Sequence, residues 1–329
     1  MLLGLTSSSS GSQRPTINQP SIPRAYFLSS FRTSVKIFCL FLILGTQFLN
    51  SQIIKTEWIE WEIPQSILEK GISPRFITSN QFHDLYLLDD QNYWLVLIPG
   101  DGTQPRIAGG WGDSGELFSL PTDIIASPGL DVFVCDNATH RILRFDRKLN
   151  FIADIVLSTK TSNRIEYPYR IARNDLGEII VASSEEWEIN LISNDRLSIT
   201  RMGDATYGED RFFEIEDIGV GLNNEIGLID LGTNTFIVLT RVGQVKDKIP
   251  LPDSSFGLVH WWLDRWIIVG RRGDIYVISP TQGIFKEILD QFPLKEEFFI
   301  TDCTIIDDVI YIVDELSGKI YKAELRFLD

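Results

Sequence analysis

The chain contains few of the residues on which disulfide-rich or zinc-dependent folds are built. Only three cysteines and three histidines occur among its 329 residues. Three cysteines cannot form a disulfide framework, and no Cys-x-x-Cys, His-x-His or His-Glu spacing indicates a zinc site. The sequence also lacks a Gly-x-Ser-x-Gly elbow and a glycine-rich loop ending in Gly-Lys-Ser/Thr. Neither an α/β-hydrolase nucleophile nor a P-loop is therefore indicated.

Basic residues are also scarce. The chain has 30 lysines and arginines against 45 acidic residues, which gives a net charge of −15. The first 51 residues hold four of the basic residues and no acidic one, so the remainder carries −19. A surface of this sign repels phosphate backbones and anionic lipid headgroups. The composition thus argues against nucleic-acid or membrane-surface binding and leaves a protein or a small molecule as the partner.

Residues 1–51 have the pattern of a leader. Arg32 and Lys36 precede an apolar run of 13 residues from Ile37 to Leu49, and polarity returns at Asn50. This run is shorter than the roughly 20 residues of a membrane span, which favours a signal peptide. An uncleaved N-terminal anchor is the alternative and is the one predicted route to a membrane. Residues 1–30 precede the basic flank and fit an over-long start, and residues 52–329 are expected to be periplasmic or extracellular.

A repeat organises residues 52–329. The segment DVFVCDNATHRILRFDRKLNFIADI, which begins at Asp131, recurs in altered form with starts near Asp84, Glu178, Glu225, Arg265 and Asp308. The successive offsets are 47, 47, 47, 40 and 43 residues. Each copy holds short β-branched and aromatic runs separated by polar turns, and a period of this size is typical of propellers. The sequence predicts an all-β fold, a six-bladed β-propeller of four-stranded antiparallel blades.

The two ends of this domain indicate how the ring closes. The last copy stops after its third strand, KIYKAELRF, whereas IIKTEWIEWEI at Ile53–Ile63 supplies a spare strand before the first copy. We expect this N-terminal strand to complete the sixth blade, which removes an open sheet edge. Cys135 and Cys303 fall in non-adjacent copies and are expected to be two buried thiols.

The second copy carries a recognisable signature. GGWGDSGELFSLPTDIIASPGLDVFVCDNATHRILRFD, from Gly109 to Asp146, resembles the NHL repeat in its glycine-rich turn, its proline and its Asp136 and His140-Arg141-Ile142. Thr139 stands where the repeat has asparagine. The Asp136 column continues in other copies as Asp89, Asp230 and Asp314, but Ser183 and Gly270 replace it in two of them. The resemblance implies an NHL-like six-bladed propeller, in agreement with the count of repeats.

The inner strands of the blades predict a shared rim around the axis. Aligning the copies gives one column of Phe76, Asp123, Arg170, Asp217, Gly257 and Asp302. The preceding column is Arg75, Thr122, Tyr169, Glu216, Phe256 and Thr301. From these columns we predict a ligand-binding rim of Asp123, Arg170, Asp217, Asp302, Arg75, Tyr169 and Glu216.

Two interpretations of the rim remain open. In the first, the aspartates brace neighbouring strands and Arg170 neutralises them, which fits an exported ligand- or protein-binding module without a cofactor. Alternatively, converging carboxylates could hold Ca²⁺, as expected for a metal-dependent, lactonase-like hydrolase or lyase acting at the axial rim. Arg170 places a cation where the metal would lie, which favours the first interpretation. No catalytic residue and no metal ligand is assigned.

Overall fold

The computed structural model describes most of the repeat region. The described residues are 53–55, 58–126, 129–157, 164–185, 187–195, 198–203, 211–252, 255–279, 283–286 and 298–327. The predicted leader at residues 1–51 lies outside them. In the described part of the chain no helix is long and apolar enough to cross a membrane.

Six antiparallel sheets follow one another along the chain, as the repeat predicts. Blade 1 holds β3 (Phe76–Ser79), β4 (Leu85–Asp89), β5 (Trp94–Ile98) and β6 (Arg106–Gly109), and blade 2 holds β7 (Pro121–Ile125), β8 (Asp131–Asp136), β9 (Arg141–Asp146) and β10 (Phe151–Val156). Blade 3 holds β11 (Pro168–Arg173), β12 (Ile179–Ser183), β13 (Ile189–Ile192) and β14 (Ile199–Gly203), and blade 4 holds β15 (Ile215–Val220), β16 (Ile226–Asp230), β17 (Thr235–Leu239) and β18 (Val245–Pro250). Blade 5 holds β19 (Phe256–Trp262), β20 (Arg265–Gly270), β21 (Ile275–Ser279) and β22 (Gly283–Lys286), and blade 6 holds β23 (Ile300–Ile306), β24 (Val309–Asp314) and β25 (Lys319–Phe327).

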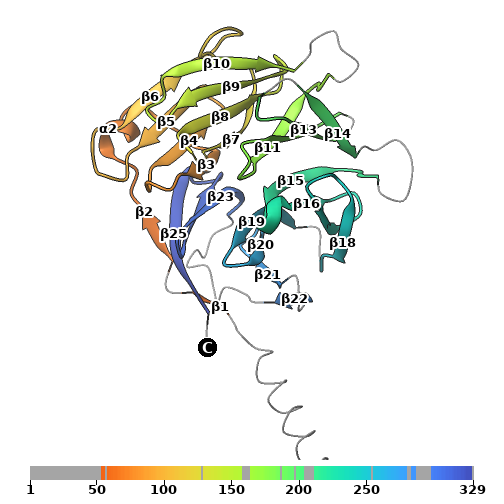
Figure 1. Cartoon of the computed structure of the whole chain (residues 1–329). Coiled ribbons are helices and arrows are strands. Elements are labelled where there is room, and N and C mark those ends of the chain that lie inside the picture. The colour runs from red at the N-terminus through yellow and green to blue at the C-terminus, as the bar shows by residue number, and fades with distance from the viewer. Residues whose placement is uncertain are drawn as a thin grey trace, which may run out of the picture. The chain divides into compact units, whose positions relative to one another are not determined.

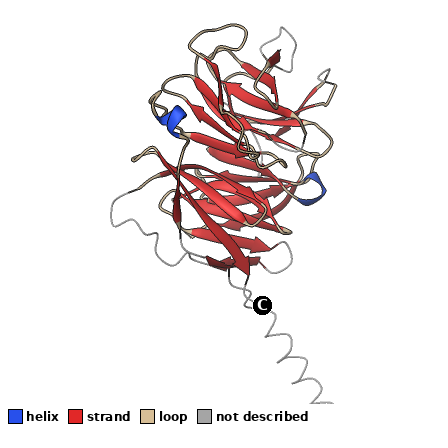
Figure 2. Cartoon of the chain, turned by 90° about the vertical axis from the view of Figure 1, so that its left-hand side faces the viewer, coloured by secondary structure: helices blue, strands red, loops and turns tan. Residues whose placement is uncertain are grey.

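The first strands of the blades surround a common axis (Figure 1). Each of them contacts the first strand of the next blade, and β23 of the last blade contacts β3 of the first. Among the described residues the helices are short, namely α2 (Gln65–Leu68) and the 3₁₀ turn η1 (Leu222–Asn224), as Figure 2 shows. The prediction of a six-bladed β-propeller is confirmed.

The N-terminal segment completes the sixth blade. It forms two short strands, β1 (Ile53–Lys55) and β2 (Ile59–Trp61), instead of one continuous strand. Both pair antiparallel with β25, with Ile53 opposite Phe327 and Ile59 opposite Lys322. The two ends of the domain are therefore joined by backbone hydrogen bonds, and the ring has the predicted closure.

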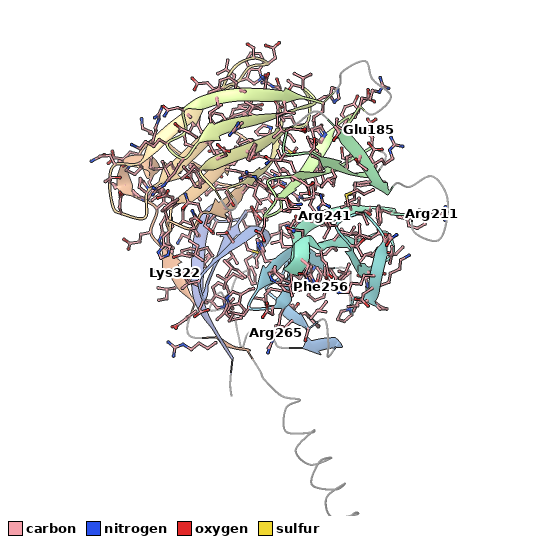
Figure 3. All side chains as sticks on the ribbon, in the orientation of Figure 1. Glu185, Arg211, Arg241, Phe256, Arg265 and Lys322 are labelled. Atoms are coloured by element: carbon pink, nitrogen blue, oxygen red, sulfur yellow. The ribbon has the colours of Figure 1, made fainter. Side chains whose placement is uncertain are left out.

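Apolar side chains pack between neighbouring blades. Phe256 is fully buried with residues of blades 4 and 5, and Figure 3 shows it among their strands. Trp58 is buried in the same way between blades 5 and 6, beside Trp262 and Tyr321. Cys135 and Cys303 are buried free thiols, as predicted. Each blade thus packs apolar side chains against the blade before it and the blade after it.

The recurring aspartate at the end of the second strand is structural. Asp136 accepts hydrogen bonds from the backbone N–H groups of Ser119 and Leu120, just before the first strand of its own blade. Asp89, Asp230 and Asp314 do the same in blades 1, 4 and 6. In blade 3 the Ser183 hydroxyl donates to a carbonyl instead. In blade 5 Gly270 has no side chain, and the backbone bond from Arg271 to Ser255 remains, a bond that blades 2, 3, 4 and 6 also have. The aspartate column accordingly fixes how the chain enters four of the six inner strands.

A second polar contact occurs at two junctions that lie two blades apart. Asp84 of blade 1 forms a two-point ion pair with Arg147 of blade 2, with N–O distances of 2.5 and 3.1 Å. Glu178 and Arg241, each 94 positions later, form the same contact between blades 3 and 4. Asn80 and Asn174 support the two acids from equivalent turns. The repeating unit in this part of the ring is therefore a pair of blades.

Closure by the N-terminal segment can be tested with neighbouring side chains. Trp58 is 5% exposed whereas Ile59, the next residue, is 57% exposed. We expect Trp58→Ala to lower the free energy of unfolding by about 3–5 kcal/mol, since it leaves a cavity between blades 5 and 6. Ile59→Ala is the control, and we expect a change of no more than about 0.5 kcal/mol. Urea unfolding measures both, and equal effects would contradict this packing.

Candidate functional site: the axial mouth

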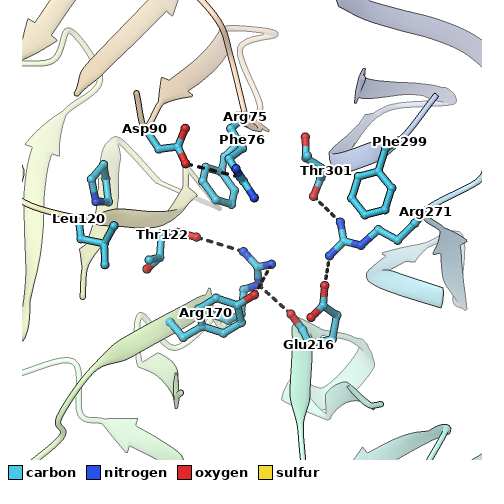
Figure 4. A pocket seen from close by; sticks show the side chains of 12 residues that line it. Arg75, Phe76, Asp90, Leu120, Thr122, Arg170, Glu216, Arg271, Phe299 and Thr301 are labelled. Atoms are coloured by element: carbon cyan, nitrogen blue, oxygen red, sulfur yellow. Dashed lines mark hydrogen bonds and ion pairs between the residues drawn. The ribbon is translucent and has the colours of Figure 1, made fainter. Parts of the chain in front are cut away.

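A pocket opens at the end of the axis where the inner strands begin. It has a volume of about 340 Å³ and draws residues from all six blades. Its lining consists of Arg75, Phe76, Asp90, Leu120, Pro121, Thr122, Tyr169, Arg170, Glu216, Arg271, Phe299 and Thr301. Figure 4 shows the guanidinium groups of Arg75, Arg170 and Arg271 directed into it. We call this pocket the axial mouth.

Four of the seven predicted site residues line the axial mouth, namely Arg75, Tyr169, Arg170 and Glu216. Arg75 lies at the rim, 39% exposed, and pairs with Glu315 at 3.1 Å and with Asp90 at 3.5 Å. Arg75 lies at the rim because it directly precedes β3, where the chain enters the inner strand.

Arg170 ties three blades together. Its Nε donates to the backbone carbonyl of Glu216 in blade 4 at 2.8 Å, and its Nη1 donates to that of Thr122 in blade 2 at 3.1 Å. The guanidinium lies 4.4 Å from the centre of the Tyr169 ring, and burial raises the pKa of that phenol. Burial alone would lower the pKa of Arg170, but the field of Asp123 and other neighbouring acids raises it overall. Arg170 therefore remains charged and fixed.

Arg271 is a mouth residue that the aligned columns missed. It follows β20, and its Nη1 donates to the carbonyls of Ile300 and Thr301 at 3.0 and 2.6 Å. Its Nη2 pairs with the Glu216 carboxylate. The side chain crosses Gly257, where an added Cβ would collide with the Arg271 Nε. The sequence contained one indication of this arrangement, namely Gly257 in the inner-strand column. A glycine there has no side chain and so leaves room for the side chain of another residue.

The other three predicted residues, Asp123, Asp217 and Asp302, do not line the axial mouth. Each follows a lining residue by one position and joins its blade to the next. Asp123 accepts from the N–H of Ile171 at 2.8 Å, and Asp217 accepts from that of Val259 at 2.8 Å. Asp302 accepts from Ile77 at 2.7 Å, which links blade 6 to blade 1. These carboxyl groups act as backbone acceptors at every second blade junction.

The buried environment perturbs these three carboxyl groups. Burial raises the pKa of Asp123 to about 6 and that of Asp217 to about 7, against the lowering effect of Arg170. Burial and the charge of Asp123 raise the pKa of Asp302 well above its ordinary value. Loss of hydration therefore outweighs the favourable hydrogen bonds and the cation.

The predicted Ca²⁺ alternative needs several free oxygens around one point. The Asp123 and Asp302 carboxylates each accept a backbone N–H on both oxygens, from Ile124 and Ile171 and from Cys303 and Ile77. Within the described ranges no group of three or more His, Cys, Asp and Glu side chains could hold a metal ion. These residues do not fit a calcium site.

Comparison with known proteins gives a fold without a family. No family model matches the chain, and no curated protein matches its sequence. Among solved structures, a streptogramin B lyase is similar with a TM-score of 0.58 and 16% identity, covering 84% of this chain and 98% of that one. A gluconolactonase from Xanthomonas campestris has a TM-score of 0.56 and 10% identity, covering 83% and 97%. YCF48 bound to D1 peptide has a TM-score of 0.52 and 13% identity, covering 76% of each chain. Identities this low show a shared fold alone.

The perturbed carboxyl groups predict a pH dependence. A carboxyl group whose pKa is higher in the folded state stabilises the fold fully below its unfolded pKa, and this contribution is lost as pH rises through the folded pKa. For Asp217 the window runs from about 4 to about 7. We expect the stability of the wild type relative to Asp217→Asn to fall across this window, by at most about 1.4 kcal/mol per pH unit. Urea unfolding between pH 4 and 8 measures it, and a constant or rising difference would contradict the assigned direction.

Proposed function

We propose that this chain is an exported, NHL-like propeller that binds a small molecule or a peptide segment at the axial mouth. The observation that carries the proposal is the pocket itself, in which residues from all six blades meet. Its volume of about 340 Å³ lies within the range of small-ligand sites. Aromatic walls and a few charged groups are the usual composition of such sites.

Export and the NHL-like character are supported by the sequence. The leader pattern at residues 1–51 favours a periplasmic or extracellular location. The column of Asp89, Asp136, Asp230 and Asp314 makes equivalent hydrogen bonds in four blades, as expected for a shared repeat consensus. The partner itself is not specified by these features.

Binding is favoured over metal-dependent hydrolysis or elimination. The similar structures include a lyase and a gluconolactonase, but a shared fold does not imply a shared activity. The buried aspartates already accept backbone N–H groups, and Arg170 provides a cation among them. YCF48, which has a similar fold, is bound to a peptide in its solved structure. Propellers of this kind can therefore bind peptides.

The proposal can be tested by blocking the axial mouth. Leu120 lines the pocket and is 46% exposed, and Val242 is 66% exposed in the turn between β17 and β18. We expect Leu120→Trp to weaken ligand binding by about tenfold or more, because the larger ring fills the entrance, a loss equivalent to about 1.4 kcal/mol. Val242→Trp, the control, should bind as the wild type does.

Thermal-shift and calorimetric measurements with a defined panel would make the comparison. The panel contains amino acids, dipeptides, monosaccharides, sugar acids and aromatic acids. Binding of a panel member by the wild type and Val242→Trp but not by Leu120→Trp supports the proposal. Equal binding by all three proteins, or no binding by any, overturns it.

A further inference from the structure

Three cations meet in the axial mouth of an acidic protein. Arg75, Arg170 and Arg271 come from blades 1, 3 and 5, and their guanidinium groups face the same space (Figure 4). The lining contains only two carboxylates, Asp90 and Glu216. These three guanidinium groups are partly compensated by Asp90, Glu216 and Glu315. In a chain of net charge −15, they are the donors that an anionic group would meet in the mouth.

The two inner arginines keep donors available. A guanidinium group offers five N–H groups. Arg170 makes three hydrogen bonds with described residues, and Arg271 also makes three. Two N–H groups on each have no acceptor in the described part of the chain. On Arg271 one of them is on Nε, which lies against Gly257, so one Nη2 N–H is left for a ligand. Because the existing bonds fix both side chains, the remaining donors are already oriented before a ligand arrives.

Thr301 gives an independent indication. It lines the mouth and is only 5% exposed, and its Oγ1 has no hydrogen-bond partner among the described residues. A buried hydroxyl without a partner costs about 1–3 kcal/mol. Its backbone carbonyl accepts from Arg271 at 2.6 Å, so Thr301 and the Arg271 guanidinium are neighbours in the wall. An acceptor oxygen on a ligand would satisfy this hydroxyl.

The rest of the wall is apolar. Phe76, Tyr169 and Phe299 supply rings, and Leu120 and Pro121 supply aliphatic surface. The Tyr169 ring lies 4.4 Å from the Arg170 guanidinium and the Phe299 ring lies 5.7 Å from that of Arg271. A ligand that fits both kinds of surface has a charged end and an apolar body.

We propose that the axial mouth binds a small carboxylate with an apolar or aromatic body, and that Arg75, Arg271 and the Thr301 hydroxyl receive the carboxylate. Planar guanidinium groups suit a carboxylate because two N–H groups can reach its two oxygens. Arg170, tied to blades 2 and 4, is a positioning residue beneath them. This inference rests on the proposed function and specifies the chemistry of its ligand.

Matched probes test the charge. We would titrate the protein by calorimetry with 3-phenylpropanoate and with its neutral amide, 3-phenylpropanamide. N-acetyl-alanyl-phenylalanine and its C-terminal amide form a second pair, which distinguishes a peptide C-terminus from a free acid as the source of the carboxylate. We expect each acid that fits to bind about tenfold or more tightly than its amide, as charge-assisted hydrogen bonds imply.

Two variants locate the contact. Thr301→Val removes the hydroxyl but keeps the shape, so we expect the preference for the acid to fall severalfold while the melting temperature stays equal or rises. Arg75→Gln should also reduce the preference, because Arg75 lies at the rim, 39% exposed. The control is Arg326→Gln, which is 59% exposed and pairs with Glu324 away from the mouth.

The outcomes separate this inference from the proposed function. A preference for the acids that both mouth variants reduce and Arg326→Gln retains supports it. Equal binding of acid and amide that Leu120→Trp abolishes overturns the carboxylate but leaves the mouth as a binding site. Failure of both acids to bind also overturns it, and the wider panel then decides the proposed function. A preference unchanged in Thr301→Val and Arg75→Gln overturns the assignment of these residues.

Discussion

The axial mouth depends on buried carboxyl groups that hold neighbouring inner strands at a fixed spacing. Asp123, Asp217 and Asp302 each accept a backbone N–H from the following blade, at three of the six junctions. The inner strands of a propeller are not hydrogen-bonded to one another as a sheet, so side chains must set their separation. Here the contact is short, desolvated and directional, and its loss would leave a buried N–H without an acceptor. These junctions therefore determine the positions of the residues that line the pocket.

Arginines supply contacts at two of the three remaining junctions at the mouth. Arg170 bonds to carbonyls on both flanking blades, and Arg271 crosses from blade 5 to two carbonyls of blade 6. Carboxyl groups from blades 2, 4 and 6 thus accept N–H groups, and guanidinium groups from blades 3 and 5 donate to carbonyls. Arg75 of blade 1 pairs with carboxylates instead. The Asp84–Arg147 and Glu178–Arg241 pairs show the same two-blade period farther from the mouth. Alternation of acceptors and donors satisfies both kinds of backbone group around the axis.

The repeat period predicted most of the fold, because a regular offset specifies blade number and an incomplete last copy specifies closure. Aligning the inner strands also gave Arg75, Tyr169, Arg170 and Glu216, four of the seven predicted residues, which line the axial mouth. It could not predict that Asp123, Asp217 and Asp302 turn toward the next blade while Tyr169 and Glu216 face the pocket, because that depends on side-chain direction at the strand entry. Arg271 was missed for a related reason: it belongs to the end of β20 and reaches the axis only over Gly257.

The acidic exterior and the cationic mouth act on a ligand at different distances. Beyond the surface, a protein of charge −15 repels anions in proportion to their charge, and salt screens this over about 10 Å. A polyphosphate or a nucleic acid meets the largest repulsion, whereas a monocarboxylate meets the smallest. In the proposed mode of binding, hydrogen bonds to Arg75, Arg271 and Thr301 inside the mouth offset this electrostatic repulsion. Only a group that reaches these three residues gains them. One negative charge on a small body is therefore favoured in this mode, because a second charge adds repulsion outside the mouth and Glu216 already occupies Arg271 inside it.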